Sequence, residues 1–544
     1  MNSAEYSSKD LDHLGIVAVV CREIGLAEEI DRIVGVDPRQ KVTPGEAVVA
    51  MVLNTLGFVD RPLYLFPEFM ATKPVELLIG EGLKAEGFND DVLGRTLDKI
   101  YRAGPEGIFM RIAANAYKEY MGKGRFFHND TTTMSLQGEY EHEEGDLDAV
   151  PIRITRGYSK DGRPDLKQFV ISLVMSDDLP VFIQALSGNA SDKNHFREIV
   201  KEYGASLQEK WGDDKIWVWD SAVYSEKNIK EISPSYKWIT RVPETLSEAK
   251  ELIENSDLEK MRSTSLDGYR LFSTEVEDGG VKQRWIVVFS EKAFMREKKT
   301  LEEKMEKEKE KVEKGVWHFS NHDFCSADDG LKALRKLEKK WKYHRVKGIE
   351  VVEKRKRKGG GRGRPGNGEE LQCFYHIKAG FEEDEGAIRK EMLRRGKFIL
   401  ATNELESEKL SDEEALKAYK EQQHAERGFR FLKDPLFFAD SMFLKNEDRI
   451  VAMVMIMGLA LMVYSLAEHR LREALEKEDE TIPDQRKKPT KKPTMRRVFQ
   501  IFEGITVLYI GSKMVKVLNL RPIHAKILRL LGREYERVYC TSYG

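Results

Sequence analysis

Short runs of β-branched and aromatic residues alternate with helical patterns between residues 124 and 243. The stretch GRFFHNDTTTMSLQGEY predicts one strand, and DLKQFVISLVMSDDLPVFIQALSGN predicts two more that are joined by a short turn. KIWVWD predicts a fourth strand that leads into a helix, and KWITRVP predicts a fifth. Strands that meet helices in this order predict an α/β fold with a mixed sheet and helices around it.

The chain of 544 residues is too long for one compact core, so we expect several units. Residues 1–122 have apolar positions at helical spacing and predict an all-α N-terminal domain. The sheet pattern occupies residues 123–243 and resumes in 391–470, where KFILATNE predicts a buried strand. Between them, residues 244–390 predict a mostly β segment with a charged helix, and residues 471–544 predict a basic loop and a small α/β piece.

Positive and negative charges almost cancel, because 90 Lys and Arg stand against 92 Asp and Glu for a net charge of −2. The composition gives no global sign of a nucleic-acid binder, so any such surface must be local. One candidate is KRKRKGGGRGRPGNG, with seven basic residues and no acid between Lys354 and Arg364 on a backbone too rich in glycine for a helix. Another is RKKPTKKPTMRR at 486–497. Both loops are suited to neutralise phosphates, and their alternative is a disordered segment that aids solubility.

Three further features bear on the class of protein. The four cysteines are far apart without metal-binding spacing, which predicts reduced thiols in a cytoplasmic protein. The first residues, MNSAEYSSKD, lack the pattern of a signal peptide. The apolar run Ile450–Tyr464 is shorter than the ~20 residues that a bilayer requires, and charged residues flank it closely. It therefore predicts a buried helix and no membrane span.

Two aspartates stand at the ends of predicted strands. Asp130 closes FFHND and Asp220 closes IWVWD. Because residues two apart share a face of a strand, Phe126 and His128 point the same way as Asp130. If the two strands are neighbours, the two carboxylates lie side by side at one edge of the sheet. An aspartate at a strand end is also a common turn-former, so neither residue is decisive alone.

A third acid lies in AYKEQQHAERGFRFLKDP, where titratable and aromatic residues are densely packed before Pro435, which we expect to end a helix. Gly428 costs ~1 kcal/mol in the middle of a helix, which makes sense if another group must approach closely. The alternative interpretation is a polar stripe that faces solvent. On one helix, residues three and four apart form a single stripe, which contains Tyr419, Gln422, Glu426, Arg430 and Lys433.

Two aspartates and one glutamate form an all-oxygen ligand set, which suits Mg²⁺ or Mn²⁺ rather than zinc. Two such ions ~3.5–4 Å apart activate an attacking water or hydroxyl and stabilise the leaving oxygen of a phosphodiester. A glutamate among cations indicates a phosphate-rich ligand, and this chemistry fits the basic loops.

These motifs resemble a DDE transposase of a prokaryotic insertion sequence, of the superfamily named for insertion sequence four. NDTTT at Asp130 resembles the context of that family's first acid, and VWDSAVYS at Asp220 resembles the context of its second. Tyr419, Glu426 and Lys433 are in register with the family pattern Y-x2-R-x3-E-x6-K, in which Gln422 replaces the usual arginine. GYSKDGRPDLKQ, ALSGNASD and KFILATNE are also similar to family segments.

The resemblance implies an RNase H-like core interrupted by a β-rich insertion domain, and a possible DNA-end-binding role for the N-terminal domain. It implies that Asp130, Asp220 and Glu426 are catalytic and bind two Mg²⁺ or Mn²⁺ ions during cut-and-paste transposition. Double-stranded DNA, as terminal inverted repeats and target, is the implied partner of a homodimer in the cytoplasm, associated with the nucleoid. The residues expected to contact DNA are Tyr419, Gln422, Arg427, Arg430, Lys433, Lys354, Arg355, Lys356, Arg357, Arg362 and Arg364.

Two other functions stay open. One is a catalytically inactive or co-opted DNA-binding protein, and the other is an RNase H-like nuclease of repair or resolution. Inverted repeats around the gene favour mobility, and nicking without joining of ends favours the nuclease. A purely structural role leaves the stripe around Glu426 unexplained.

Overall fold

The computed structural model describes residues 6–58, 65–120, 124–136, 140, 150–212, 214–357, 371–434, 446–511 and 513–540. The chain forms two compact units. The first contains residues 1–240, 279–281 and 417–544, and the second contains residues 241–278 and 282–416. The expected boundaries at 122 and 470 do not separate units, because both lie inside the first one.

The N-terminal region is helical, as predicted. The Thr43 side chain accepts a hydrogen bond from the backbone N–H of Glu46, whose carboxylate accepts one from the backbone N–H of Thr43. This capping box fixes where helix α3 begins. The helices of this region are α1 (Leu14–Glu23), α2 (Leu26–Val34), α3 (Pro44–Leu56), α4 (Phe66–Ala71), α5 (Val75–Leu78), α6 (Asp90–Ala103) and α7 (Pro105–Tyr120).

A mixed sheet forms the centre of the first unit, which confirms the predicted sheet type. The strands that the first unit contributes to this sheet are β2 (Phe126–Leu136), β3 (Lys167–Ser176), β4 (Leu179–Leu186), β5 (Ile216–Trp219) and β6 (Lys237–Arg241), in the order β4-β3-β2-β5-β6. Strands β2, β3 and β4 form an antiparallel meander, whereas β5 and β6 run parallel to β2. The predicted Ser-Asp-Asp turn joins β3 to β4, with Asp177 at φ +54°.

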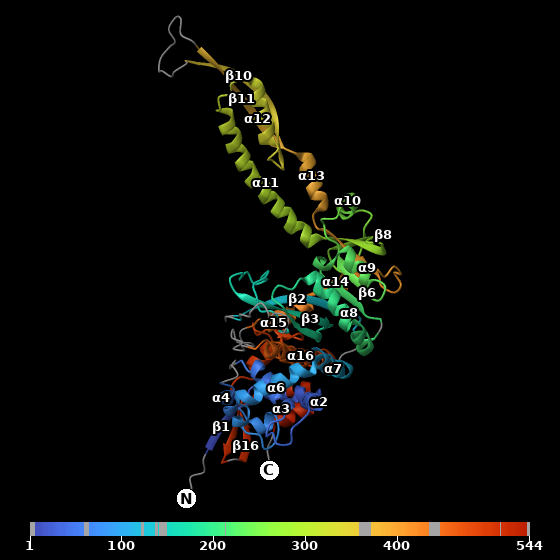
Figure 1. The fold of residues 1–544 in the computed structure, drawn as a ribbon, viewed down its shortest axis with the longest axis vertical. Helices are drawn as coiled ribbons and strands as arrows, with labels where there is room; N and C mark the ends of the chain where they lie inside the picture. Colours follow the sequence, from blue (N-terminus) through green and yellow to red (C-terminus); the bar gives the residue numbers. More distant parts are fainter. Residues whose placement is uncertain are drawn as a thin grey trace. The chain divides into compact units, whose positions relative to one another are not determined.

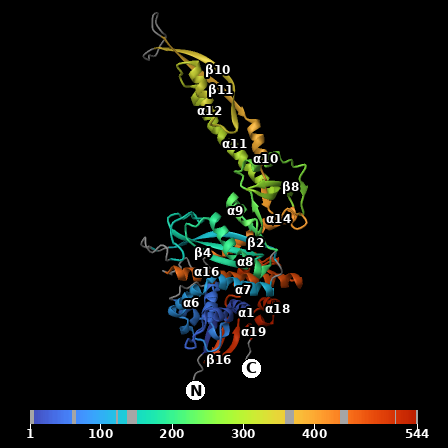
Figure 2. The same cartoon turned by 45° about the vertical axis from the view of Figure 1, so that its right-hand side comes forward.

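Helices lie on both faces of the sheet (Figures 1 and 2). On one face, Phe196 of α8 (Asp192–Trp211) makes ring contacts with Trp217 and Trp219 of β5. On the other face, the buried His128 of β2 makes a hydrogen bond with the carbonyl oxygen of Ala418 through Nε2, at 2.8 Å. Residues of β2 that share the face of His128 are therefore directed towards the segment that carries the predicted third acid.

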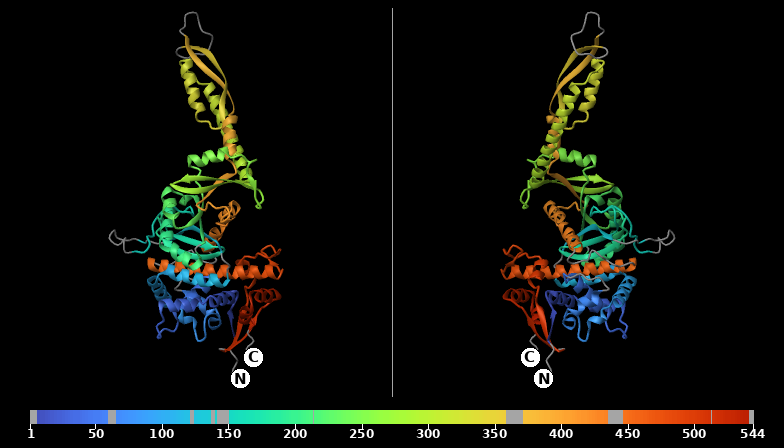
Figure 3. Two further views of the ribbon diagram at one scale, coloured as in Figure 1. Left: turned by 90° about the vertical axis from the view of Figure 1, so that its right-hand side faces the viewer. Right: turned by 90° about the vertical axis from the view of Figure 1, so that its left-hand side faces the viewer.

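The predicted apolar helix is α16 (Glu447–Lys477), which lies between the sheet and the N-terminal helices (Figure 3) and contacts β4, α1, α3, α6 and α7. Among the described helices, α16 is the one long and apolar enough to cross a membrane, and 83% of its most apolar window is buried inside the protein. Its apolar side chains therefore form core, as predicted. The helix continues beyond residue 470, where the sequence had predicted a domain boundary.

The C-terminal region packs against the N-terminal one. Strand β1 (Tyr6–Asp10) pairs antiparallel with β15, and the Glu23 carboxylate accepts hydrogen bonds from Arg470 and Tyr535. The N-terminal and C-terminal regions therefore belong to the same compact unit. The elements of the C-terminal region are β13 (Ile482–Pro483), β14 (Pro489–Thr490), α17 (Met495–Ile501), β15 (Thr506–Ile510), β16 (Lys513–Leu518), α18 (Pro522–Leu531) and α19 (Arg533–Tyr539).

The second unit is mixed α/β, so the prediction of a mostly β segment at 244–390 is wrong in this respect. The predicted hairpin is confirmed, since β8 and β9 are neighbours and Gly279 and Gly280 both have positive φ between them. The helices are α10 (Ser247–Asn255), α11 (Glu291–Ser320), α12 (Ala327–Glu338) and α13 (Glu385–Arg394), and α11 alone spans 30 residues. The strands are β7 (Arg262–Ser263), β8 (Tyr269–Asp278), β9 (Val281–Ser290), β10 (His344–Arg357), β11 (Leu371–Glu383) and β12 (Lys397–Thr402).

Candidate active site

The two aspartates belong to neighbouring segments of the sheet, Asp130 within β2 and Asp220 directly after β5. In the parallel pair of β2 and β5, His128 lies opposite Val218. Asp220 follows the last residue of β5 with an extended backbone, at φ −78° and ψ 161°. The pairing ends at His128 and Val218; if its register is continued by two residues, Asp130 comes opposite Asp220, and neighbouring strands lie ~4.8 Å apart. Both residues lie on the face of His128, because they continue its alternation.

Asp130 lies inside a strand and does not close it, which corrects the prediction. Strand β2 continues to Leu136 because β3 pairs with it as far as Lys167. Strand β5 ends at Trp219, so the backbone of Thr131 faces no residue of β5. Instead, the Asp130 Oδ1 atom accepts a hydrogen bond from the backbone N–H of Thr131 at 2.7 Å.

Lys160 lies next to the first acid, Asp130. Its Nζ atom lies 3.9 Å from Asp130 Oδ1, and it donates to the Thr131 carbonyl oxygen at 2.8 Å and to the Thr131 hydroxyl at 2.7 Å. The side chains of Lys160 and Asp130 are 31% and 30% exposed, so a ligand can reach this pair from solvent. The ammonium group offsets the negative charge of Asp130 in this conformation.

Asp220 stands at the start of a tight turn. Its Oδ1 atom accepts a hydrogen bond from the backbone N–H of Ser221 at 2.7 Å, and the 3₁₀ turn Ser221–Val223 follows. The chain then enters α9 (Glu226–Ile232), where the Ser225 hydroxyl caps the N–H of Asn228. The predicted strand and helix are both present, with this turn between them.

The segment of the third acid forms two helices rather than the predicted one. These are α14 (Asp412–Lys420) and α15 (Gln423–Leu432). Between them, the N–H of Gln422 bonds to the carbonyl oxygen of Tyr419, three residues earlier, which tightens the last turn of α14. Tyr419 therefore lies on a different helix from Glu426. The predicted end at Pro435 lies outside the described residues.

Glu426 lies in the first turn of α15 with an exposed side chain, and α15 packs on β2 and β3. Gly428 permits this packing, because a Cβ atom there would lie 2.9 Å from Leu173 Cδ2 of β3 and 3.3 Å from Leu461 Cδ2 of α16. The groups that approach Gly428 closely, as predicted, are therefore the core side chains of Leu173 and Leu461. It brings the helix that carries Glu426 onto the sheet that carries both aspartates.

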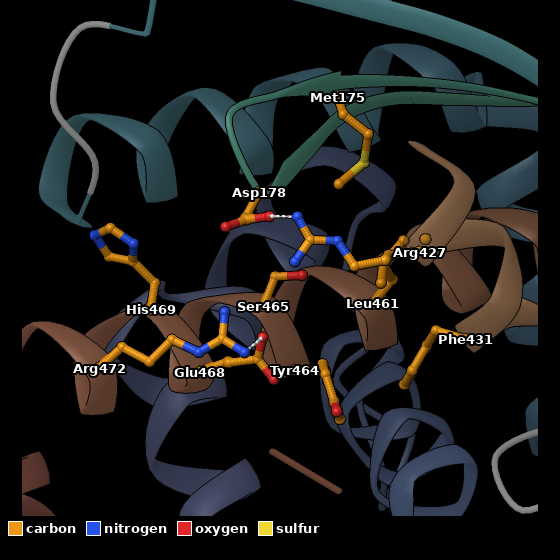
Figure 4. A pocket seen from close by; sticks show the side chains of 11 residues that line it. Met175, Asp178, Arg427, Phe431, Leu461, Tyr464, Ser465, Glu468, His469 and Arg472 are labelled. Carbon is orange, nitrogen blue, oxygen red and sulfur yellow. Dashed lines mark ion pairs between the residues drawn. The ribbon is translucent and has the colours of Figure 1, made fainter. Parts of the chain in front are cut away.

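Two of the cations predicted near Glu426 are engaged with acids of the loops between strands. Arg427 forms an ion pair with Asp178 of the β3–β4 turn at 3.3 Å, as Figure 4 shows. The Lys433 Nζ atom donates to Asp161 Oδ1 at 2.5 Å. Asp161 directly follows Lys160 in the loop between β2 and β3, so this bond ties the end of α15 to the loop beside the first acid.

The other three side chains of the predicted stripe differ in exposure. Arg430 is exposed on α15, so its guanidinium group is accessible to a phosphate. Tyr419 and Gln422 are half-buried. Contact of these three residues with DNA stays a prediction.

A small cavity of about 80 Å³ lies beside α15, lined by Arg427, Tyr464 and Glu468 among others (Figure 4). Glu468 forms an ion pair with Arg472 at 2.6 Å and accepts a hydrogen bond from the backbone N–H of Met495 at 2.7 Å. Burial raises the pKa of Glu468 above its usual value despite Arg472, and burial also raises the pKa of Tyr464. The hydrogen bond from the Met495 N–H to Glu468 attaches the end of the basic segment 486–497 to α16. This end of the predicted basic loop is therefore held against the helix.

The other basic segment lies in the second unit. Its residues Lys354, Arg355, Lys356 and Arg357 are the last residues of β10 and do not belong to a loop, which corrects the prediction. Arg355 forms an ion pair with Glu353 at 3.0 Å, and Lys356 forms one with Asp323. Arg362 and Arg364 lie outside the described residues.

The donor set of the two aspartates suits the predicted metal. Carboxylates on or directly after two neighbouring parallel strands provide the hard oxygen donors that Mg²⁺ or Mn²⁺ prefers. Within the described part of the chain, however, no three His, Cys, Asp or Glu side chains are close enough together to hold a metal ion. The structure therefore pairs the strands β2 and β5, and Asp130, Asp220 and Glu426 do not form such a cluster in it.

Comparison with known protein families matches two ranges of the chain. The transposase DDE domain family matches residues 139–463, and a domain of unknown function, DUF4277, matches residues 6–114. The first match spans more than half of the chain. The chain belongs to the DDE transposase family. The matched range contains Asp220 and Glu426, and Asp130 precedes it by nine residues.

Among solved structures, this DDE transposase is similar to a piggyBac transposase in a synaptic complex with hairpin DNA, with 10% sequence identity and a TM-score of 0.37. The similarity covers 89% of this chain and 80% of that one, and at this TM-score it carries no weight in the assignment. No curated protein matches the sequence significantly.

Lys160 and Asp161 are residues near the site that sequence reasoning did not single out. Both residues lie in GYSKDGRPD, a stretch rich in turn-forming residues between two predicted strands. Such a stretch predicts a loop, but it does not predict which residues the loop contacts. The contacts with Asp130 and Lys433 depend on how the loop folds back over β2, which local patterns do not reveal.

Proposed function

We propose that this transposase belongs to the superfamily named for insertion sequence four and moves its insertion sequence by a cut-and-paste mechanism. It hydrolyses phosphodiester bonds at the element's ends and transfers the strands into target DNA. Asp130, Asp220 and Glu426 are the proposed catalytic acids. The observation that carries the proposal is the parallel register of β2 and β5, from which both aspartates share one face, with the helix of Glu426 packed on β2.

The strand order supports an RNase H-like core. An antiparallel meander, β2-β3-β4, is extended on the other side of β2 by the parallel strands β5 and β6. The parallel connection from β2 to β5 lets two strands deliver acids to the same end of the sheet. On this proposal, the second unit is the insertion between the second and third acids.

The proposed metal ligands are Asp130, Asp220 and Glu426. Two Mg²⁺ or Mn²⁺ ions would supply charge stabilisation to the attacking and leaving oxygens when bound. The protein's own contribution is to orient the carboxylates, because the backbone N–H groups of Thr131 and Ser221 each hold one oxygen of an aspartate. The exposed Glu426 has the rotamer freedom to approach them.

Double-stranded DNA is the proposed partner, as terminal inverted repeats and as target. Arg430 and Lys433 lie on or next to the helix of Glu426, where their charge suits phosphates near the cut. We also propose that two copies of the chain assemble on paired ends, and that residues 1–122 take part in binding those ends.

Cleavage of supercoiled plasmid that carries the element's ends tests the assignment. With Mg²⁺ or Mn²⁺ the wild-type protein should cut at the ends and join them to target DNA, and Asp220→Asn and Glu426→Gln should not. Matched controls are Asp214→Asn, before β5, and Glu473→Gln, exposed on α16, which should cut like wild type. Wild-type cutting by Glu426→Gln would refute the assignment, and nicking without joining would favour a nuclease.

A further inference from the structure

Helix α15, which carries Glu426, holds its position through its own contacts. The tight turn at Gln422 separates it from α14, so α15 is a helix in its own right and not the end of a longer one. It contains ten residues, Gln423–Leu432, and packs on β2, β3 and α16. The placement of the proposed third acid therefore depends on what orients these ten residues on the sheet.

Apolar contacts fix how close α15 lies to the sheet. Gly428 packs against Leu173 of β3 and Leu461 of α16, with no space for a side chain between them. Leu173 pairs with Asp130 across β3 and β2, so this contact brings α15 near the first acid. Apolar burial has no preferred direction, however, and a helix that rests on leucine side chains can still rotate about its axis. A directional contact is needed to fix that rotation.

Arg427 makes a directional contact of this kind with the sheet. Its Nη2 atom lies 3.3 Å from Asp178 Oδ1, and the two side chains point toward each other beside α16 (Figure 4). Asp177 and Asp178 are the two residues between β3 and β4, and a hairpin turn of two residues is held firmly by its strands. The ion pair therefore joins α15 to a fixed point of the sheet.

A second ion pair lies next to the first. Glu468 and Arg472 of α16 are 2.6 Å apart and line the same cavity as Asp178 and Arg427. Burial raises the pKa of Glu468, and the charge of Arg472 opposes this shift. The charges of Asp178 and Arg427 also act on Glu468, the first raising its pKa and the second lowering it. The four groups therefore form one network, and ion pairs contribute more in a network than singly.

We propose that Arg427 is a positioning residue for Glu426, with Asp178 as its anchor, and not a contact to DNA. Because the two residues are consecutive on α15, any rotation that separates Arg427 from Asp178 turns Glu426 through the same angle. At ~6 Å from the helix axis, a rotation of about 20° moves a side chain by ~2 Å. A misplacement of ~1 Å can cost ~10²-fold in rate. The proposal rests on the proposed function, because Arg427 acts through Glu426.

Single-turnover cleavage of DNA from the element's ends, started with Mg²⁺ and with protein in excess, tests the proposal. Arg427→Gln and Asp178→Asn should each slow cleavage about fivefold, the bias that one partly exposed ion pair provides. The double variant should be no slower than either single one, because both substitutions break the same contact. Affinity for the same DNA in EDTA should stay within twofold of wild type. Lys201→Gln, which breaks an exposed ion pair with Glu231 between α8 and α9, is the matched control and should cut like wild type.

Hydrogen exchange of the full-length protein, followed by mass spectrometry without DNA or metal ions, gives a readout that does not need activity. Amides of residues 423–432 should exchange about twofold to fivefold faster in Arg427→Gln and Asp178→Asn than in wild type, and Lys201→Gln should match wild type there. Unchanged exchange in both variants would overturn the proposal. So would weaker DNA binding by Arg427→Gln alone, which would show a phosphate contact. A wild-type protein that does not cut would overturn the proposed function, while the exchange result would still show whether the ion pair holds α15.

Discussion

Gly458 shows how tightly one residue of α16 is packed. A Cβ atom there would lie 2.8 Å from both Ile183 Cγ2 of β4 and Phe109 Cε2 of α7. Gly458→Ala should therefore lower the free energy of unfolding by ~1–3 kcal/mol, because overpacking outweighs the better helix propensity of alanine. Denaturant titration followed by circular dichroism measures the change.

Gly107 of α7 provides the matched control for this substitution. A Cβ atom there meets nothing within 4 Å, and the residue is exposed. Gly107→Ala should leave stability unchanged or raise it by up to ~1 kcal/mol, because propensity then acts alone. A stability gain in Gly458→Ala as large as in Gly107→Ala would show that α16 is less closely packed than the distances indicate.

Single residues also show where prediction from sequence reached its limit at the site. The face shared by His128 and Asp130 follows from strand alternation, and the contact of His128 with Ala418 shows what that face meets. The neighbouring position of Asp220 required the pairing of β2 with β5, which are distant in sequence and whose register no local pattern contains. The contact of Lys160 with Asp130 depended on loop folding and was not predicted.

At the scale of elements, His13 joins three parts of the first unit. It stands just before α1, its Nε2 atom bonds to the carbonyl oxygen of Leu56 at the end of α3 at 2.7 Å, and its ring stacks on Phe499 of α17 at 4.1 Å. Complete burial lowers its pKa from about 6.5 to about 3, although the bond to Leu56 opposes this shift and the charge of Lys73 adds to it.

This lowered pKa predicts a loss of stability in acid. The unfolded chain takes up a proton below pH 6.5 and the folded one does not until about pH 3, so stability falls as the pH decreases through this window. The loss is about 2 kcal/mol at pH 5. His13→Gln should show a smaller loss between pH 7 and 5 in urea titrations, whereas His469→Gln, at a half-buried position on α16, should follow wild type. Identical pH slopes for wild type and His13→Gln would contradict the prediction.

Most elements of the first unit were predictable because their signals are local. The capping box at Thr43, the apolar run of α16 and the β-branched run of β3 all appear in a few consecutive residues. The break between α14 and α15 was missed because KEQQHAER has helix-forming residues throughout, and nothing local requires the tight turn at Gln422. The placement of Asp130 at the end of a strand was wrong, because β2 continues to Leu136 in its pairing with β3, inside the stretch predicted as one strand.

At the scale of the whole molecule, the N-terminal region depends on residues from the other end of the chain. Tyr6 of β1 pairs with Ile510 of β15, and the Tyr539 hydroxyl donates to the carbonyl oxygen of Asp12 at 2.6 Å. Sequence patterns predicted both regions as separate pieces, because pairing between residues so distant in sequence leaves no periodic trace in either.

A fragment of residues 1–122 should therefore not fold stably alone. It lacks β15, α16 and Tyr539, whose ring fills the space beside Gly15, so apolar faces of α1, α3 and α6 become exposed. We expect weak helicity and no cooperative thermal transition by circular dichroism. Mixing with a second polypeptide, residues 446–544, should restore a cooperative transition because it supplies all three partners. If the fragment alone melts at the temperature of the full chain, the N-terminal helices form an independent domain, and their DNA binding can then be measured in isolation.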